Sequence, residues 1–100
     1  MNFQAIMKQA QNMQKDITKI KNDIDSTEFE GKSSLVTVLV NGKKKVKKIT
    51  INDDAKDLIN DDLTMLEDMI VLALNDAFSK IDKVTEEKMG KYSNLMPGMF

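Results

Sequence analysis

The residues best suited to chemistry in this 100-residue chain are the lysines that follow an Asn-Gly pair in residues 40–50, VNGKKKVKKIT. Five lysines fall within six consecutive positions: Lys43, Lys44, Lys45, Lys47 and Lys48. Ammonium groups gathered on one strand attract phosphates, so the stretch predicts contact with the backbone of double-stranded DNA. A charged edge strand that protects a sheet from aggregation is the competing interpretation, because neighbouring lysines repel by only about 0.6 kcal/mol per pair in water. The two interpretations do not exclude each other.

Two further sets of lysines are candidates for phosphate contact. Lys8, Lys15 and Lys19 are spaced i, i+7 and i+11, which places them on one face of a helix. Such a face can lie along phosphates, although it is also what an ordinary solvated helix face looks like. The third set, near the end of the last predicted helix, suits the helix dipole in any case and is the weaker candidate; it comprises Lys80, Lys83, Lys88 and Lys91.

The charge composition limits what kind of DNA recognition is expected. All 15 basic residues are lysine, whereas arginine is the usual bidentate reader of guanine, so we expect phosphate contacts with little sequence preference. The net charge is −1, and residues 53–68 hold seven acidic residues and one lysine, a local charge of −6. Basic and acidic surfaces must therefore point in different directions. The carboxylates of Asp53, Asp54 and Asp57 are interpreted as helix caps rather than as metal ligands.

Several functions are disfavoured by the residues that the chain lacks. Without Cys and His there is no thiolate nucleophile, no imidazole base and no Cys/His zinc site. No nucleophile–base pair or phosphate-cradling Gly-rich loop is present, so we expect no enzyme, cofactor, metal or small-molecule substrate. The longest apolar run, residues 69–74, is six residues long, against roughly 20 for a membrane span. With no secretory signal at the start, cytoplasmic residence without a membrane partner is the expectation.

The first element that must position these lysines is a long helix, predicted over residues 2–24. Its apolar residues step alternately by three and four, as in a coiled-coil seam: Phe3, Ile6, Ala10, Met13, Ile17, Ile20 and Ile24. Because the seam is narrow and the other faces are polar, the helix needs another helix beside it.

A short sheet is predicted next. Residues 28–30 alternate like a brief first strand, and residues 35–40 and 43–51 flank Asn41-Gly42, a strong hairpin signal. A two-residue turn would place lysines beside valines on one face. A three-residue loop, or a bulge near Lys47-Lys48, would instead bring Val46 to the apolar side. We expect such an irregularity.

A second long helix is predicted from about residues 61–62 to Met89, with Gly90 as its stop, after a short helical turn over residues 55–60. Its segment MIVLAL, residues 69–74, is apolar all round, which favours burial by the sheet on one side and a second protomer on another. The predicted dimer or core interface comprises Leu66, Met69, Ile70, Ala73, Leu74 and Ala77. The fold class is therefore α+β, with a single domain over residues 1–90 and a flexible tail over residues 91–100.

Four segments together resemble the YbaB/EbfC family of bacterial nucleoid-associated proteins. Residues 7–14, MKQAQNMQ, are similar to its opening helix, and Val40-Asn41-Gly42 sits where the family has its hairpin turn. Residues 65–70, MLEDMI, followed by ALNDA at 73–77, resemble its most characteristic segment, and MPGM at 96–99 is also similar. The resemblance implies a protomer of helix, three-stranded antiparallel sheet and long helix, forming a homodimer with projecting helical arms. It also implies double-stranded DNA binding in the nucleoid.

Two hypotheses for function follow. The leading one is a homodimeric nucleoid-associated protein that coats or bridges DNA by lysine–phosphate contacts, with roles in nucleoid organisation and gene regulation. A dimer would gather ten lysines from residues 43–48; if half met phosphates, log affinity would fall against log salt with a slope of about −4 to −5. The alternative is a non-enzymatic adaptor that uses its long helices and its acidic residues 53–68 to recruit another protein.

Overall fold

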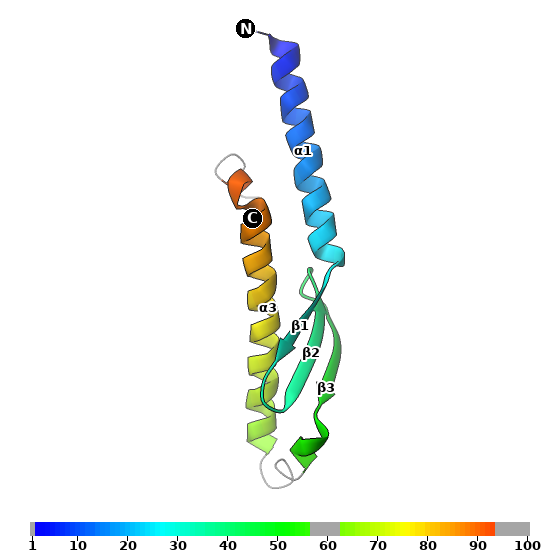
Figure 1. The fold of residues 1–100 in the computed structure, drawn as a ribbon, viewed down its shortest axis with the longest axis vertical. Helices are drawn as coiled ribbons and strands as arrows, with labels where there is room; N and C mark the ends of the chain where they lie inside the picture. Colours follow the sequence, from blue (N-terminus) through cyan, green and yellow to red (C-terminus); the bar gives the residue numbers. More distant parts are fainter. Residues whose placement is uncertain (1, 57–62, 94–100) are drawn as a thin grey trace.

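Two long helices and a three-stranded sheet make up the molecule, a computed structural model that describes residues 2–56 and 63–93 (Figure 1). The order of elements is α1 (Phe3–Ser26), β1 (Glu28–Lys32), β2 (Val36–Asn41), β3 (Val46–Ile51), the 3-10 helix η1 (Asp53–Ala55) and α3 (Leu63–Ser93). The molecule is elongated, with extents of 72 × 20 × 15 Å. The predicted α+β class and the order of helix, three strands and helix are confirmed. The predicted helical turn over residues 55–60 falls largely outside the described residues.

Helix α1 is stabilised at both ends. The C-terminal half of its apolar seam packs against α3, and its first turn is capped by Asn2. The Asn2 side chain accepts hydrogen bonds from the backbone N–H groups of Gln4 (3.1 Å) and Ala5 (3.3 Å). In its second half, Ile17 and Ile24 are buried where α1 packs against α3. The helix runs to Ser26, two residues beyond the predicted end, and stops where Thr27 turns to an extended conformation.

The sheet is antiparallel in the order β1-β2-β3, and its register resolves the conflict between lysines and valines on the hairpin. Val40 pairs with Val46 but Leu39 pairs with Lys48, so Lys47 is an extra residue in β3, a β-bulge. The expected irregularity near Lys47 is confirmed. It places Val46 on the same face as Val40, because cross-strand partners share a face.

Helix α3 lies on one face of β1 and β2 at very short range (Figure 1). A Cβ built on Gly31 would stand 2.1 Å from the Ala73 carbonyl oxygen and 2.7 Å from the Ala77 Cβ, so three small residues form this contact. Around it lies the core, whose buried members are Ile17, Ile24, Phe29, Leu35, Val36, Val38, Val40, Ala55, Ala73, Ala77, Ile81 and Met89.

One turn of α3 also covers the free edge of β1. The Lys32 backbone N–H donates to the Asp76 carboxylate (3.0 Å), and the Lys80 ammonium donates to the Glu30 carbonyl oxygen (2.7 Å). Asp76 and Lys80 also pair with each other at 3.2 Å. Two backbone groups that would otherwise invite another strand are thereby satisfied within the protomer.

Helix α3 does not stop at Gly90, so that prediction was wrong: the helix continues to Ser93. A glycine inside a helix costs only about 1 kcal/mol relative to alanine. Met89 is buried and Tyr92 packs against the core, so tertiary contacts on both sides of Gly90 hold the last turn. The predicted start at residues 61–62 lies outside the described residues. Within the described part of the chain, neither long helix is apolar enough over a sufficient length to cross a bilayer.

Gly31→Ala should lower the free energy of unfolding by about 3 kcal/mol, because the new methyl group meets backbone atoms of α3 that cannot move aside independently. Gly90→Ala is the matched control. A Cβ there meets nothing within 4 Å, so the substitution should raise stability by roughly 0.5–1 kcal/mol. Urea unfolding at a fixed protein concentration measures both. Equal effects of the two substitutions would contradict the close approach of α3 to β1.

The contacts of Asp76 and Lys80 with the edge of β1, referred to below as the clamp, should make the free energy of unfolding depend on pH in acid. The hydrogen bond from the Lys32 N–H, and secondarily the one from Lys80, hold the pKa of Asp76 below its ordinary value of 3.8. A lowered folded-state pKa contributes stability that is present above about pH 4 and is lost as the pH falls through the folded-state value. Asp76→Asn keeps an acceptor for Lys32 but removes the titration, so its unfolding midpoint should fall less steeply below pH 4 than that of the parent chain. Parallel curves for the two proteins would argue against the clamp.

Candidate nucleic-acid interface

The lysine-bearing turn between β2 and β3 is organised by Asn41. Its side-chain oxygen accepts hydrogen bonds from the backbone N–H groups of Lys43 (2.9 Å) and Lys45 (3.1 Å). The backbone N–H of Asn41 donates to the Lys45 carbonyl oxygen (3.0 Å). The loop thus has three residues, Gly42 to Lys44, and the third of them takes a left-handed conformation with φ of 65°. The three-residue loop and the bulge, which were alternatives in the sequence, are both present.

The same turn is lodged against the C-terminal end of α1. The Gly42 N–H donates to the Thr27 carbonyl oxygen at 3.1 Å. A Cβ on Gly42 would lie 1.9 Å from the Ile24 carbonyl oxygen, so only glycine fits here. The carbonyl end of a helix carries partial negative charge, and α1 has no basic residue in its own last turn. Lys43 lines a shallow cleft with Asp25 and Ser26 at that end.

Among the described residues, Lys44 is the lysine of the turn that pairs with another element. Its ammonium nitrogen lies 3.2 Å from a carboxylate oxygen of Asp82 and 5.9 Å from the centre of the Phe78 ring, both on α3. The residue with the left-handed backbone conformation is therefore also the one whose side chain links the hairpin to α3.

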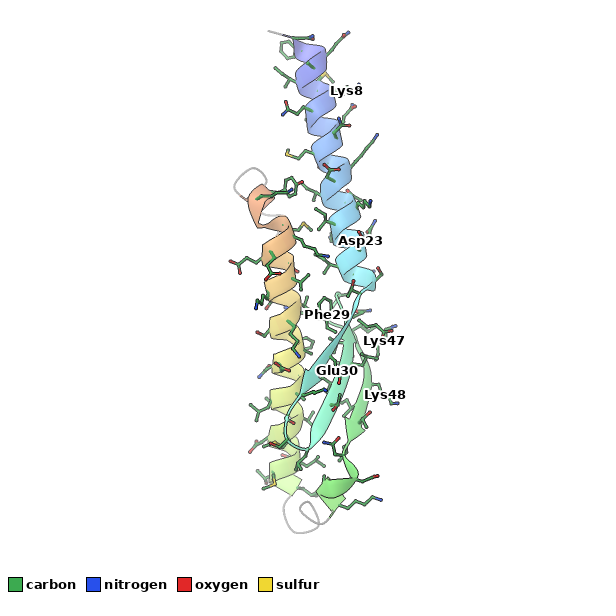
Figure 2. The ribbon with its side chains drawn as sticks, in the orientation of Figure 1. Lys8, Asp23, Phe29, Glu30, Lys47 and Lys48 are labelled. Carbon is green, nitrogen blue, oxygen red and sulfur yellow. The ribbon has the colours of Figure 1, made fainter. Side chains whose placement is uncertain are left out.

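The other four lysines of the cluster remain available to a polyanion. Lys43, Lys45, Lys47 and Lys48 are exposed, and within the described residues none of them has a carboxylate at ion-pairing distance. Lys48 stands opposite Leu39, on the sheet face that α3 does not cover, and Figure 2 shows Lys47 and Lys48 projecting away from α3. The structure therefore keeps most of the cluster's charge unneutralised and turned outward.

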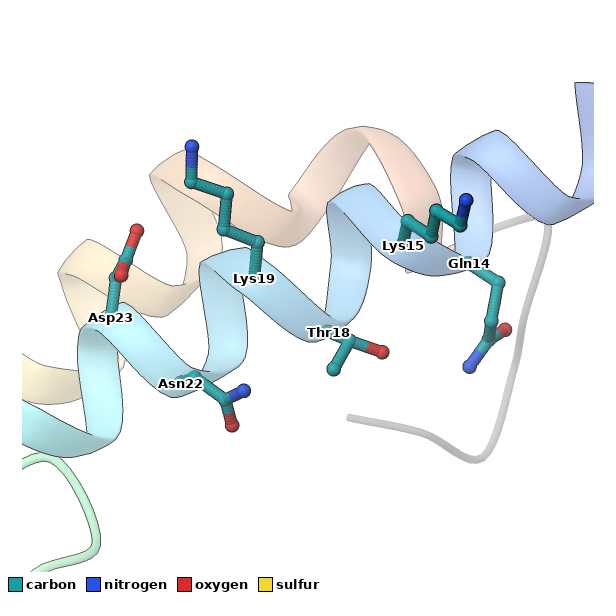
Figure 3. Close-up of a pocket in the computed structure, with 6 residues that line it drawn as sticks. All are labelled: Gln14, Lys15, Thr18, Lys19, Asn22 and Asp23. Atoms are coloured by element: carbon teal, nitrogen blue, oxygen red, sulfur yellow. The ribbon is translucent and has the colours of Figure 1, made fainter.

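The second predicted set lies along the outer side of α1. Lys15 and Lys19 line an open groove of about 470 Å³ together with Gln14, Thr18, Asn22 and Asp23 (Figure 3). Lys8 lies two turns nearer the start of α1 and is also exposed (Figure 2). The first acidic residue of the chain is Asp16, so the first half of α1 carries only positive charge.

The α3 lysines are partly engaged in structural contacts. Lys80 is held by β1 and Asp76, and the Lys91 ammonium lies 5.0 Å from the centre of the Tyr92 ring. Lys83 and Lys88 are exposed. Lys80 and Lys91 are thus less available to DNA than the unpaired lysines of the hairpin.

The described parts of the acidic segment, η1 and the start of α3, lie at the opposite end of the molecule from the start of α1 (Figure 1). Asp53, Glu67 and Asp68 are exposed there, and Asp53 pairs loosely with Lys56 at 3.9 Å. Asp57 and residues 61–62 fall outside the described residues. In the part of the chain that the structure describes, no three carboxylates come together as metal ligands would.

The predicted dimer or core residues divide into two groups. Ala73 and Ala77 are fully buried inside the protomer, against Gly31. Four others are half-buried and pack at the margin of the core: Leu66, Met69, Ile70 and Leu74.

An exposed apolar row on β3 was missed by the sequence prediction. Val46, Ile49 and Ile51 pair with Val40, Val38 and Val36 and share their face, yet they are 41%, 44% and 42% exposed while those valines are fully buried. The register with its bulge is the signal that reveals the row, and it could not be placed from sequence alone.

The fold and this surface define a small, lysine-rich helix–sheet–helix protein whose basic hairpin is suited to a polyanion. Comparison with known proteins gives the family. The YbaB/EbfC DNA-binding family matches residues 1–96, and the chain belongs to it. The family is described as one of DNA-binding proteins.

Individual relatives agree over nearly the whole length. A nucleoid-associated protein of Ligilactobacillus salivarius is 45% identical over 101 residues, which cover 99% of this chain and 95% of that protein. One from Enterococcus faecalis is 40% identical over 99 residues, covering 97% and 93%. The crystal structure of the uncharacterized protein HP0035 from Helicobacter pylori has the same fold, with a TM-score of 0.68 and 20% identity over 96% of this chain and 99% of that one.

Proposed function

We propose that this protein is a homodimeric, nucleoid-associated protein that binds double-stranded DNA mainly through lysine–phosphate contacts with little sequence preference. The observation that carries the proposal is a set of four exposed lysines on and beside the hairpin turn of a member of a DNA-binding family, none of which forms an ion pair with another described residue. The relatives' names support a place in the nucleoid. Roles in nucleoid organisation and in gene regulation are part of the proposal.

The chemistry of the cluster favours the phosphate backbone over the bases. A lysine ammonium acts as a point charge, whereas bidentate reading of guanine is typically done by arginine, which the chain lacks. The exposed ammonium groups would release counterions from DNA, so binding should weaken steeply with salt. The acidic end of the molecule, far from α1's N-terminal half, would be held away from the duplex.

Dimer formation is supported by the apolar row of β3. Its three residues belong to the face that carries the core, but α3 packs on β1 and β2 and leaves the row exposed. An apolar sheet face left open beside a core is typical of a surface that a second subunit covers.

Helix α3 extends this apolar surface. Val71, Leu74 and Phe78, at i, i+3 and i+7, share one side of the helix. Phe78 lies beside Lys44, which precedes β3 in the chain. Asp76, on another side of α3, accepts a hydrogen bond from β1. In the proposed dimer, the side of α3 bearing Val71, which is 54% exposed, would be covered together with the β3 row.

Replacing the four unpaired lysines, Lys43, Lys45, Lys47 and Lys48, with Gln should weaken binding to duplex DNA at least tenfold at low salt, because eight charges would leave the dimer. The slope of log affinity against log salt should become shallower by about 3 to 4 if half of them contact phosphate. Fluorescence anisotropy on one duplex at several salt concentrations measures both quantities.

The control for this experiment removes the same number of exposed lysines elsewhere, at Lys32, Lys56, Lys83 and Lys88. It should change affinity much less than the hairpin variant. An equal loss in both variants would mean that net charge, and not the hairpin, governs binding. No binding by the parent chain at low salt would defeat the proposed function itself.

Ile49→Glu should break the dimer without unfolding the protomer, because the side chain is already 44% exposed and the charge would be buried only on association. Thr50→Glu, one position along β3 on the opposite face, is the matched control and should leave association unchanged. Sedimentation equilibrium gives the two dissociation constants, and an increase of at least a hundredfold is expected for the Ile49 variant alone. A parent chain that sediments as a folded monomer would contradict the dimer.

A further inference from the structure

The first half of α1 carries a second apolar surface that neither the hairpin nor the proposed dimer contact uses. Phe3 is 74% exposed, Ile6 is 47% exposed and Met7 is 58% exposed. Figure 1 shows this half of the helix projecting beyond the described end of α3. We refer to residues 3–13 as the arm.

The arm's apolar residues belong to a seam whose second half, toward the C-terminal end of α1, is buried. Ile17 and Ile24 belong to the same three-and-four spacing and are 0% and 4% exposed where α3 packs on α1. Met13 and Tyr92 are partly buried and pack against the core. Helix α3 therefore covers the second half of this apolar seam of α1. In the first half of the seam, the side chains of Phe3 and Ile6 stay exposed.

The surface of the arm has the form that a helical partner requires. Ile6, Gln9, Ala10 and Met13 line an open groove of about 230 Å³. Their positions are i, i+3, i+4 and i+7, and four residues at this spacing make the hole that receives a side chain of a facing helix in a coiled coil. The groove thus points to a helix as its occupant.

The charges of the arm favour a second copy of itself. The positions that flank the seam are uncharged, namely Met7, Gln9 and Gln14, so two identical arms would meet without repulsion. The arm's charge is on the other side: Lys8 and Lys15, seven residues apart, project from the face opposite the seam. Two arms joined along the seam would display their lysines outward on both sides.

We propose that the arms of two homodimers pair along this seam and so bridge two DNA segments, each held by the outward lysines and hairpins of one dimer. The inference rests on the proposed DNA-binding function and names the partner that the arm takes. Eleven residues span about 16 Å, less than two heptads, and a helix pair of this length is marginal in water. Pairing is therefore weak between free dimers and becomes effective on DNA, where neighbouring dimers raise the local concentration of arms.

The test compares bridging with simple binding. An immobilised duplex captures a second, fluorescent duplex only if the protein connects them, while anisotropy on a single duplex measures binding. Phe3→Gln combined with Ile6→Gln should reduce capture at least fivefold and change single-duplex affinity less than twofold. The control, Gln4→Ala combined with Gln11→Ala, alters the same helix away from the seam and should match the parent chain in both assays.

The outcomes separate the possible occupants of the seam. Undiminished capture by the Phe3/Ile6 variant would overturn the inference, and so would an equal loss of capture and single-duplex affinity, since the seam would then serve binding itself. Stronger capture by a chain ending at Ser93 would assign the seam to residues 94–100 and also overturn arm pairing. A parent chain that binds no single duplex would instead defeat the proposed function.

A second measurement uses the absence of cysteine from the chain. Ile6→Cys places a thiol on the seam, and Gln11→Cys places one away from the seam while leaving every lysine in place. In air and with duplex DNA present, disulfide-linked chains should form at least five times faster for the Ile6 variant than for the Gln11 variant, and the difference should shrink without DNA. Equal rates at the two positions would contradict pairing along the seam.

Discussion

The close contact of α3 with β1 determines where every other surface of this protein lies. Gly31, Ala73 and Ala77 allow the two backbones to approach until almost no space is left between them. A helix fixed this firmly over the first two strands leaves β3 beyond its reach, so an apolar row that belongs to the core face stays partly exposed. The exposed row is thus a consequence of how small the residues are at one crossing point, and it is the surface on which the proposed dimer rests.

The same geometry separates the ways in which the molecule can associate. The outer edge of β1 is closed by Asp76 and Lys80, and β3 carries a bulge and lysines, which discourage pairing with another strand. Association through sheet edges is therefore disfavoured at both margins, and the apolar faces remain. A protein that concentrates on a long polymer benefits from this arrangement, because open edges at high local concentration promote aggregation.

Local patterns in the sequence predicted the elements, while the contacts between distant residues had to come from the structure. The alternating spacing from Phe3 to Ile24 is sufficient for α1, and Asn41-Gly42 for the hairpin, because both signals act over a few residues. Gly90 misled the prediction, since tertiary packing of Met89 and Tyr92 outweighs the weak helix preference of one glycine. The clamp joining Asp76 to Lys32 and Lys80 to Glu30 connects residues 44 and 50 positions apart, and no local pattern encodes it.

The lysine cluster shows why composition alone could not identify the candidate site. Five neighbouring lysines look equivalent in the sequence, but Lys44 pairs with Asp82 while the other four form no ion pair with any other described residue. That tie has a mechanical role, because it joins the hairpin to α3 while Gly42 lodges the same turn against α1. A phosphate drawn to the neighbouring lysines would therefore meet a cluster whose position is fixed by both long helices. Lysines held in place lose less conformational freedom on binding than lysines on a mobile loop, so the anchoring of the turn favours affinity without requiring any contact to a base.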